Sequence, residues 1–286
     1  MRIAVTGGNG FLGRHVVAAL SHYRDDLKFL VRAEQPERKI QNPDQAVRFD
    51  LHNPPDNAYE RLGSPEVLIH LAWGGLPNYG SLHHFEEELP AQYRFLKQMV
   101  ESGTENLVVT GTCFEYGMKS GPLDESIVPK PANPYGFAKN SLRQGLELLQ
   151  ARAEYGLTWF RLFYLYGSGQ SPKALIPQLD AAIANGDRTF RMSGGDQLRD
   201  YIAVQEAADL IVRLSRTKRN LGVVNLCSGQ PVSVRTFVER QIRDRNAGIA
   251  LELGYHPYSE HEPMAFWGER KHLDSILKEL EDAPKA

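Results

Sequence analysis

A tyrosine and a lysine stand one helical turn apart at Tyr135 and Lys139, and a hydroxyl residue, Thr112, precedes them. A free tyrosine keeps its proton until about pH 10, so it needs help to exchange a proton near neutrality. A cation four residues along the same helix stabilises the tyrosinate and lowers the pKa of the phenol. The Thr112 hydroxyl can bind a substrate oxygen. The three residues are candidates for proton transfer at an alcohol or a ketone.

A glycine-rich segment near the start of the chain indicates a nucleotide loop. An apolar run at residues 2–6 predicts a buried strand, and the apolar spacing of residues 11–21 predicts a helix. Glycines between them permit a tight turn, close approach of a pyrophosphate and close helix packing. The helix N-terminus then offers free N–H groups to phosphates. The residues expected to contact the cofactor here are Gly7, Gly10, Phe11, Leu12 and Gly13.

The residues after the next two predicted strands bear on the choice of cofactor. Arg32 ends the strand predicted at residues 28–31, where a guanidinium suits the 2′-phosphate of NADP. Glu34 could instead bind the ribose of NAD, and Arg32 could be a surface cation. Asp50 and Leu51 follow the third strand and are expected to contact the adenosine, although Asp50 could equally cap a loop. NADP is the expected cofactor, with NAD as the alternative.

Composition excludes several classes of protein. The 286 residues carry a formal net charge of -2, which argues against a surface built to coat nucleic acid. Two cysteines provide neither a disulfide framework nor a metal quartet, and the nine histidines lack metal-ligand spacing. His83 and His84 are expected to be solvated. No signal peptide or membrane-length apolar run is evident, so we expect a cytoplasmic protein without bound metal, nucleic acid or membrane.

Alternating strands and helices predict an α/β protein with a Rossmann-type, doubly wound parallel sheet. Residues 1–167 are expected to form the dinucleotide-binding domain, with residues 203–228 returning to it. Residues 168–286 are expected to form mainly a smaller C-terminal α/β region that binds substrate. Helices are expected at 84–101, where Pro90 marks a kink or a late start, and at 137–155.

Several motifs stand in order along the chain: TGGNGFLG at 6–13, LIHLA at 68–72, TGTCFEYG at 110–117, NPYGFAK at 133–139, RLFYLYG at 161–167 and RDY at 199–201. In these motifs the chain resembles the extended short-chain dehydrogenases/reductases, the NAD(P)-dependent nucleotide-sugar epimerase/dehydratase family. The resemblance implies a nucleoside diphosphate sugar as substrate and a homodimer through helices 84–101 and 137–155. It also implies that Leu71, Ala72, Tyr135 and Lys139 contact the cofactor.

Departures from the family pattern narrow the expected activity. The 4,6-dehydratases of the family carry an Asp-Glu pair where this chain has Cys113 and Phe114, so water elimination lacks its acid and base. Glu115 is expected to point elsewhere. Tyr164 replaces an asparagine that many epimerases use to contact the sugar nucleotide. Trp73, Thr112, Tyr164, Arg199 and Arg270 are the expected substrate contacts, with Arg199 the best candidate for the diphosphate and Arg270 a weaker one.

The resulting expectation is an oxidoreductase of deoxysugar biosynthesis. It would be an NADP-dependent reductase of a nucleotide-activated 4-keto-6-deoxysugar, in which Tyr135 supplies the proton, Thr112 steadies the oxygen and Lys139 tunes Tyr135. An NAD-dependent nucleotide-sugar epimerase is the first alternative. A non-catalytic protein that senses NADP(H) is an alternative of another class, which the intact Thr112, Tyr135 and Lys139 set disfavours.

Overall fold

A computed structural model describes residues 1–23, 26–31, 43–259 and 262–282. Its larger part is built on a parallel sheet of seven strands in the order β11-β7-β5-β4-β1-β2-β3. The strands are β1 (Arg2–Thr6), β2 (Asp26–Val31), β3 (Ala46–Arg48), β4 (Val67–His70), β5 (Asn106–Thr112), β7 (Gly156–Leu162) and β11 (Gly222–Leu226). This order confirms the predicted Rossmann-type, doubly wound sheet.

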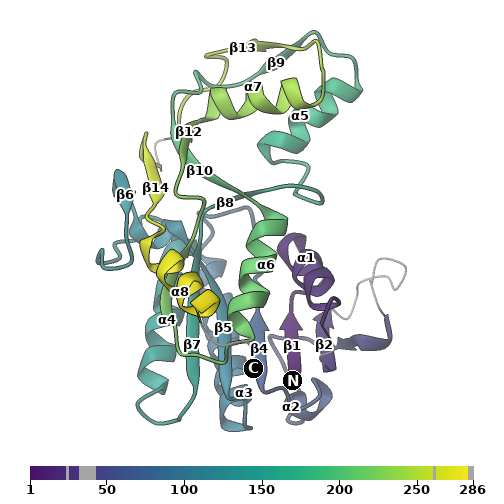
Figure 1. Cartoon of the computed structure of the whole chain (residues 1–286), viewed down its shortest axis with the longest axis vertical. Helices are drawn as coiled ribbons and strands as arrows, with labels where there is room; N and C mark the ends of the chain where they lie inside the picture. The colour runs from purple at the N-terminus through teal and green to yellow at the C-terminus, as the bar shows by residue number, and fades with distance from the viewer. Residues whose placement is uncertain (24–25, 32–42, 260–261, 283–286) are drawn as a thin grey trace.

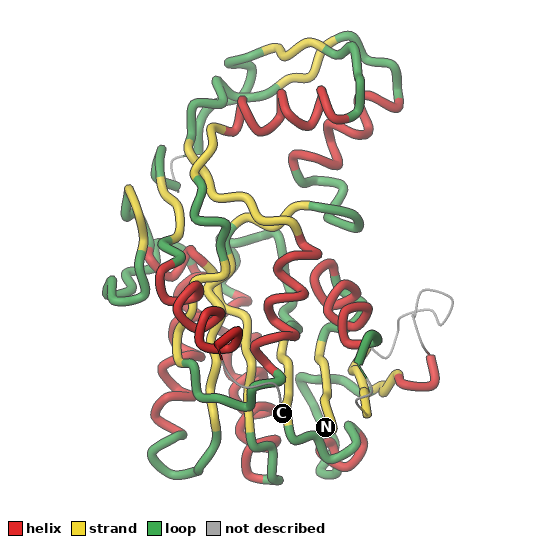
Figure 2. Tube along the Cα trace, viewed as in Figure 1, coloured by secondary structure: helices red, strands yellow, loops and turns green. Residues whose placement is uncertain are grey.

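The central strands are apolar runs because helices cover both faces of the sheet. Every residue of β4 and β5 is buried, as expected for parallel strands between two layers. Helices α1 (Phe11–Leu20), α6 (Val204–Ser215) and α8 (Lys271–Asp282) share one hydrophobic core with the sheet. Helices α2 (Ala58–Arg61), α3 (Leu89–Glu101) and α4 (Pro134–Leu149) share a second core on the other face. Figure 2 shows these helices flanking the strands.

Smaller sheets, formed mainly by the second half of the chain, lie outside the large sheet. A three-stranded sheet joins β8 (Tyr164–Tyr166), β10 (Leu198–Ala203) and β12 (Pro231–Ser233). Two further pairs join β6 (Gly121–Leu123) to β14 (Phe266–Gly268), and β9 (Thr189–Arg191) to β13 (Ala250–Glu252). Figure 1 shows α5 (Leu175–Ala184) and α7 (Val234–Asp244) beside β9 and β13, away from the large sheet. The segment that holds α6 and β11 returns to the large sheet.

Two helices differ in their bounds from the sequence expectation, for local reasons. The helix expected at 84–101 is divided into η3 (His84–Glu88), a π-helical turn, and α3, so Pro90 lies in the first turn of α3, where its missing N–H is tolerated. The helix expected at 137–155 is α4, which begins at Pro134 and ends at Leu149. The Asn133 side chain accepts a hydrogen bond from Gly136 N at 2.8 Å and so caps the start of α4.

Among the described residues, no helix has the length and apolar character to cross a membrane.

Candidate active site

The glycine-rich loop joins β1 to α1 and has no room for side chains at two positions. Gly7 adopts a φ of +70°, and a Cβ there would lie 2.9 Å from the backbone nitrogen of Ala72. A Cβ at Gly13 would lie 2.0 Å from the Gly7 carbonyl oxygen. The Gly10 N–H donates to that same carbonyl at 2.8 Å and closes the turn. The loop therefore presents bare backbone at the N-terminus of α1, the arrangement that binds phosphate groups.

Two further observations fit a dinucleotide at this loop. The side-chain nitrogen of Asn9 is buried and has no hydrogen-bond partner among the described residues. Thr6 Oγ1 accepts hydrogen bonds from the N–H groups of Leu71 and Ala72 at 3.2 Å, which fixes the segment after β4 against the loop. The residues present therefore fit the cofactor that the motif predicts, with Phe11 half-buried and Leu12 buried at the start of α1.

His70 lies behind this loop as a neutral side chain. Since Thr6 Oγ1 already accepts two N–H groups, its hydroxyl donates to His70 Nδ1, 2.9 Å away. The proton of His70 is then on Nε2, on the side of the ring where Gln92 is the hydrogen-bonding neighbour. Burial lowers the pKa of His70 to about 3.

The residues expected to choose between NADP and NAD are placed only in part. Arg32 and Glu34 lie outside the described residues, directly after β2. Asp50 is exposed, and its carboxylate accepts a hydrogen bond from His52 N at 2.9 Å, so in this structure it caps a loop. Leu51 is half-buried beside it.

The three catalytic candidates come together at the carboxyl end of β5. Thr112 is the last residue of β5, and Tyr135 and Lys139 lie on the first turns of α4. Lys139 is 2% exposed, and its ammonium donates to the Thr110 carbonyl at 2.8 Å. Helix α4 can approach because residue 136 is glycine: a Cβ there would lie 2.7 Å from the Phe114 carbonyl oxygen. The glycine within the YGFAK motif is therefore a packing requirement.

Burial moves the pKa values of the two titratable candidates in opposite directions. Desolvation raises the pKa of Tyr135 well above its usual range, and the hydrogen bond with Thr112 opposes this only weakly. Desolvation lowers the pKa of Lys139 to about 7, while the carboxylates of Glu115 and Glu88 act to raise it. Tyr135 is thus held as a protonated donor beside an ammonium that loses its charge near neutral pH.

Glu115 points away from the reacting groups, as expected, because it lies in a short helical turn that follows β5. It lies in η4 (Cys113–Tyr116) and is fully buried. Its carboxylate accepts hydrogen bonds from Thr112 N, Trp159 Nε1 and Arg161 Nε, each at 2.9 Å. All of these bonds position the end of β5. The sequence offers a signal for this role, because Thr112 and Glu115 have the spacing of a capping box.

Aromatic side chains surround Tyr135. The rings of Trp73, Tyr79, His84 and Phe114 have their centroids between 5.2 and 6.4 Å from the Tyr135 ring. The expectation that His84 is solvated is wrong, because its side chain is fully buried, whereas His83 stays half-buried. No sequence pattern places Tyr79 and His84 at the site, because they reach it only through the folding of residues 74–84 over the strand ends.

The residues expected to bind substrate fall into separate groups. Arg199 is 4% exposed and ion-pairs with Glu262 at 2.9 Å, and the Tyr164 hydroxyl donates to the same carboxylate at 2.7 Å. Arg270 belongs to another cluster, where it pairs with Asp274 and Glu206 and donates to the Cys227 carbonyl. Trp73 lies against Lys139, whose Nζ is 4.0 Å from the indole centroid.

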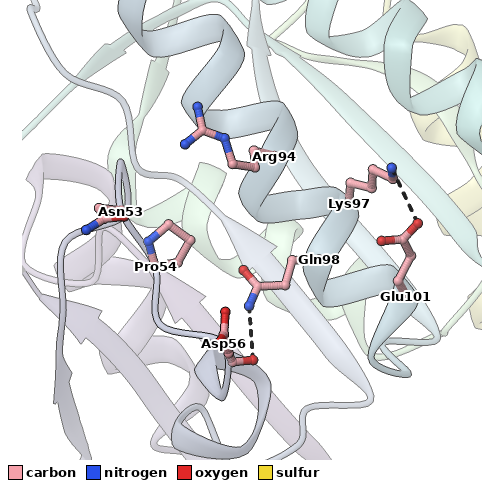
Figure 3. A pocket seen from close by; sticks show the side chains of 7 residues that line it. All are labelled: Asn53, Pro54, Asp56, Arg94, Lys97, Gln98 and Glu101. Carbon is pink, nitrogen blue, oxygen red and sulfur yellow. Dashed lines mark hydrogen bonds and ion pairs between the residues drawn. The ribbon is translucent and has the colours of Figure 1, made fainter.

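A shallow polar hollow lies elsewhere, on the outside of α3 (Figure 3). Its lining carries both signs of charge, and Lys97 and Glu101 pair across 3.5 Å. Gln98 donates to the backbone of Asp56 at 3.1 Å. None of the three catalytic candidates lines it, so we do not assign the reaction to this hollow.

The fold and the buried tyrosine–lysine pair define a dinucleotide-dependent oxidoreductase with a Rossmann-type sheet. A family model described as the NAD dependent epimerase/dehydratase family matches residues 3–227. The chain belongs to this family and is an NAD(P)-dependent oxidoreductase of the extended short-chain dehydrogenase/reductase type.

Individual relatives agree with this family. The dTDP-6-deoxy-L-talose 4-dehydrogenase (NAD(+)) of Aggregatibacter actinomycetemcomitans is 30% identical over 270 residues, which cover 94% of this chain and 99% of the relative. The dTDP-6-deoxy-L-talose 4-dehydrogenase (NAD(P)(+)) of Kitasatospora kifunensis is 25% identical and covers 98% and 94%. The structure of MoeE5 in complex with UDP-glucuronic acid and NAD has a TM-score of 0.82 at 26% identity, covering 97% of this chain and 93% of that one.

Proposed function

We propose that this chain is an NADP-dependent reductase of a nucleotide-activated 4-keto-6-deoxysugar. The observation that carries the proposal is the buried Tyr135 phenol, which is hydrogen-bonded to Thr112 and lies close to Lys139 among aromatic rings. Elimination of water would need a carboxylic acid and base beside the sugar. Where the 4,6-dehydratases carry that acid and base, this chain has Cys113 and Phe114. The carboxylate of Glu115 is already hydrogen-bonded to Trp159 and Arg161.

The reaction follows from what each side chain can do. The nicotinamide, when bound, supplies the hydride for the carbonyl carbon. The Thr112 hydroxyl holds the substrate oxygen, and Tyr135 donates its proton to that oxygen. The Lys139 ammonium stabilises the tyrosinate that remains. This interaction lowers the free energy that a buried phenol needs to release its proton. Burial excludes water from the pair and strengthens each of these electrostatic contacts.

Apolar rings favour a deoxysugar over a fully hydroxylated one. Tyr79 and Phe114 pack edge to face at 5.0 Å beside Tyr135, and a methyl group can be buried against them without leaving a polar group unpaired. Two relatives are named as 4-dehydrogenases of a nucleotide-linked 6-deoxysugar. A 4-dehydrogenase and a 4-keto reductase catalyse one reaction in opposite directions. Arg199, Tyr164 and Trp73 remain proposed substrate contacts, and Arg270 remains a weaker one.

The proposed preference for NADP rests on the residue that follows β2. Arg32 comes directly after Val31, where a guanidinium can bind a 2′-phosphate. The relatives' names include both NAD(+) and NAD(P)(+), so a direct comparison of NADPH and NADH affinity is the test. Equal affinity would favour Glu34 as a ribose contact and NAD as the cofactor.

We also propose a homodimer through the outer faces of η3, α3 and α4. Phe85, Leu89, Pro90 and Tyr93 line a groove there with Ser141 and Gly145 of α4. Phe137 and Leu148, at the same helical face of α4, are 49% and 75% exposed.

The proposed function includes a division of the chain into two regions. Residues 1–167 with 203–228 form the cofactor domain, and residues 168–286 form the mainly substrate-binding region.

The test separates the reductase from the epimerase. Nucleoside diphosphate 4-keto-6-deoxyhexoses are supplied with NADPH, and the loss of NADPH absorbance is followed beside product formation. A reductase oxidises one NADPH for each ketone reduced. Interconversion of two ordinary sugar nucleotides without added cofactor, and no oxidation of NADPH with any ketone, would identify an epimerase instead. Binding of NADP(H) without either reaction would favour the sensor.

A further inference from the structure

The loop after β4 is clamped by the π-helical turn η3. The Trp73 indole N–H donates to His84 Nδ1 at 3.1 Å, and His84 Nε2 lies 2.8 Å from the Asn78 carbonyl oxygen. Because one ring nitrogen accepts and the other faces a carbonyl, His84 is a neutral imidazole with its proton on Nε2. Every polar atom of this side chain is therefore used to hold two points of the same loop.

The contacts of η3 with the loop after β4 leave no space for side chains at Gly74 and Gly75. A Cβ at Gly74 would lie 2.3 Å from a carboxylate oxygen of Glu88, and the Glu88 carboxylate accepts the Gly74 N–H. Gly75 has a φ of +77°, and a Cβ there would lie 3.0 Å from the His83 ring and 3.1 Å from the His84 ring. Turns of π-helix are rare and often occur at functional sites. Here the turn points His84 and Glu88 at one short loop.

The clamped indole presents its face to Lys139. The ammonium lies 4.0 Å from the indole centroid and donates to the Thr110 carbonyl. A cation over an indole face is stabilised by the ring quadrupole, and more strongly where water is excluded. The titratable groups around this ammonium are Tyr135 on its own helix, Glu115 on η4, Glu88 and His84 on η3, and His70 on β4. The indole is the aromatic face nearest to the charge.

We propose that His84 is a positioning residue that orients the Trp73 indole so that its face stabilises the charged form of Lys139. The proposal rests on the proposed function, because it concerns the lysine that serves Tyr135. Trp73 then acts on the catalytic lysine, in addition to any contact with substrate. Loss of either side chain should make Lys139 release its proton at lower pH, since burial already disfavours the ammonium.

The first test is the pH profile of kcat/KM for ketone reduction. Activity that needs the Lys139 ammonium falls as the pH rises through the pKa of Lys139. In Trp73→Leu and His84→Leu this fall should move about one pH unit lower, the shift that a buried cation–π contact supports. His84→Asn keeps an acceptor at the place of Nδ1 and should return the fall to its original pH. His22→Leu, a change at an exposed histidine, is the matched control.

A second test needs no substrate. Indole fluorescence of the unaltered protein, followed against pH, should show a transition near neutrality that is absent in Lys139→Met. The transition should move to lower pH in His84→Leu and stay in place in His84→Asn. If the protein reduces no ketone but the fluorescence transition moves in His84→Leu, the proposed function is wrong and the proposed role of His84 is supported. The proposed role of His84 would be overturned if the midpoint of the fluorescence transition were unchanged in His84→Leu. It would also be overturned if both leucine variants lost the same fraction of activity at every pH.

Discussion

At the scale of single residues, one environment gives two side chains opposite properties. Tyr135 and Lys139 are both buried, and desolvation disfavours a negative charge on the first and a positive charge on the second. The phenol keeps its proton until a substrate oxygen can take it, and the ammonium is retained by Glu115, Glu88 and the Trp73 face. Such divergence within a pair is characteristic of acid–base sites.

Tyr135→Phe should abolish turnover while cofactor affinity stays nearly intact, because it deletes the proton and little volume. Loss of a general acid lowers kcat by about 10²–10⁴. Steady-state kinetics and a cofactor titration measure the two effects. Tyr23→Phe, at an exposed tyrosine, is the control. A near-normal kcat would remove Tyr135 from the mechanism.

Lys139→Met should stabilise the protein without cofactor, most strongly at and below pH 7. The pKa of Lys139 is about 7 when folded and about 10.5 when unfolded, so between these values the unfolded chain binds the extra proton and stability rises with pH. Below pH 7 the folded protein bears the full penalty of a buried charge. Urea unfolding at pH 6 and pH 9 should show a gain of up to about 4 kcal/mol that shrinks at the higher pH. A gain independent of pH would contradict this account.

At the scale of elements, strand ends and helix starts are brought to one edge of the sheet. Thr6 ends β1, His70 ends β4 and Thr112 ends β5, and all three strands are parallel neighbours. The carboxyl ends of such strands form the ligand-binding edge, at the point where the strand order reverses. The start of α1 and the start of α4 reach the same edge, one with bare backbone and the other with Tyr135 and Lys139.

Gly13→Ala tests the contact between α1 and the glycine loop. The added methyl group would overlap the Gly7 carbonyl oxygen, so the loop must shift and the phosphate site with it. We expect destabilisation of about 1–3 kcal/mol and a loss of cofactor affinity of at least about tenfold. Thermal melts and cofactor titrations measure both. Gly248→Ala, where a Cβ meets no atom within 4 Å, should change neither.

At the scale of the whole molecule, the apolar face of α3 and α4 is the feature that a monomer does not explain. Exposed Leu148 and Phe137 extend the groove that Tyr93 and Leu89 line. Contiguous apolar surface of this kind marks association. The groove lies on the side of both helices that faces away from the sheet.

Leu148→Arg should weaken that dimer, because it places a charge in the proposed interface. Light scattering after size exclusion should report about half the mass of the unaltered protein at equal concentration. Val128→Arg, at a residue 80% exposed between β6 and α4, is the control. An unaltered protein that is already monomeric would refute the proposed dimer.

Local patterns explain how much could be read from the sequence. The seven-stranded sheet was predictable from apolar runs alternating with amphipathic helices, and its family follows from motifs that are contiguous in the chain. Tyr135 and Lys139 share a site because they share a helix. The predicted start of α4 lies three residues after the observed one, because the Asn133 cap begins the helix before its apolar periodicity does.

The sequence by itself determined the residue types, their order and their spacing within single elements: the glycine loop, the Thr112 hydroxyl and the tyrosine–lysine turn. Only the tertiary structure decided which distant residues surround them. It buried His84 against Trp73, paired Glu115 with Arg161 and placed Glu262 on Arg199. The physical reason is that these contacts join separate elements, so they depend on how helices and loops pack over the strand ends and leave no period or motif in the chain.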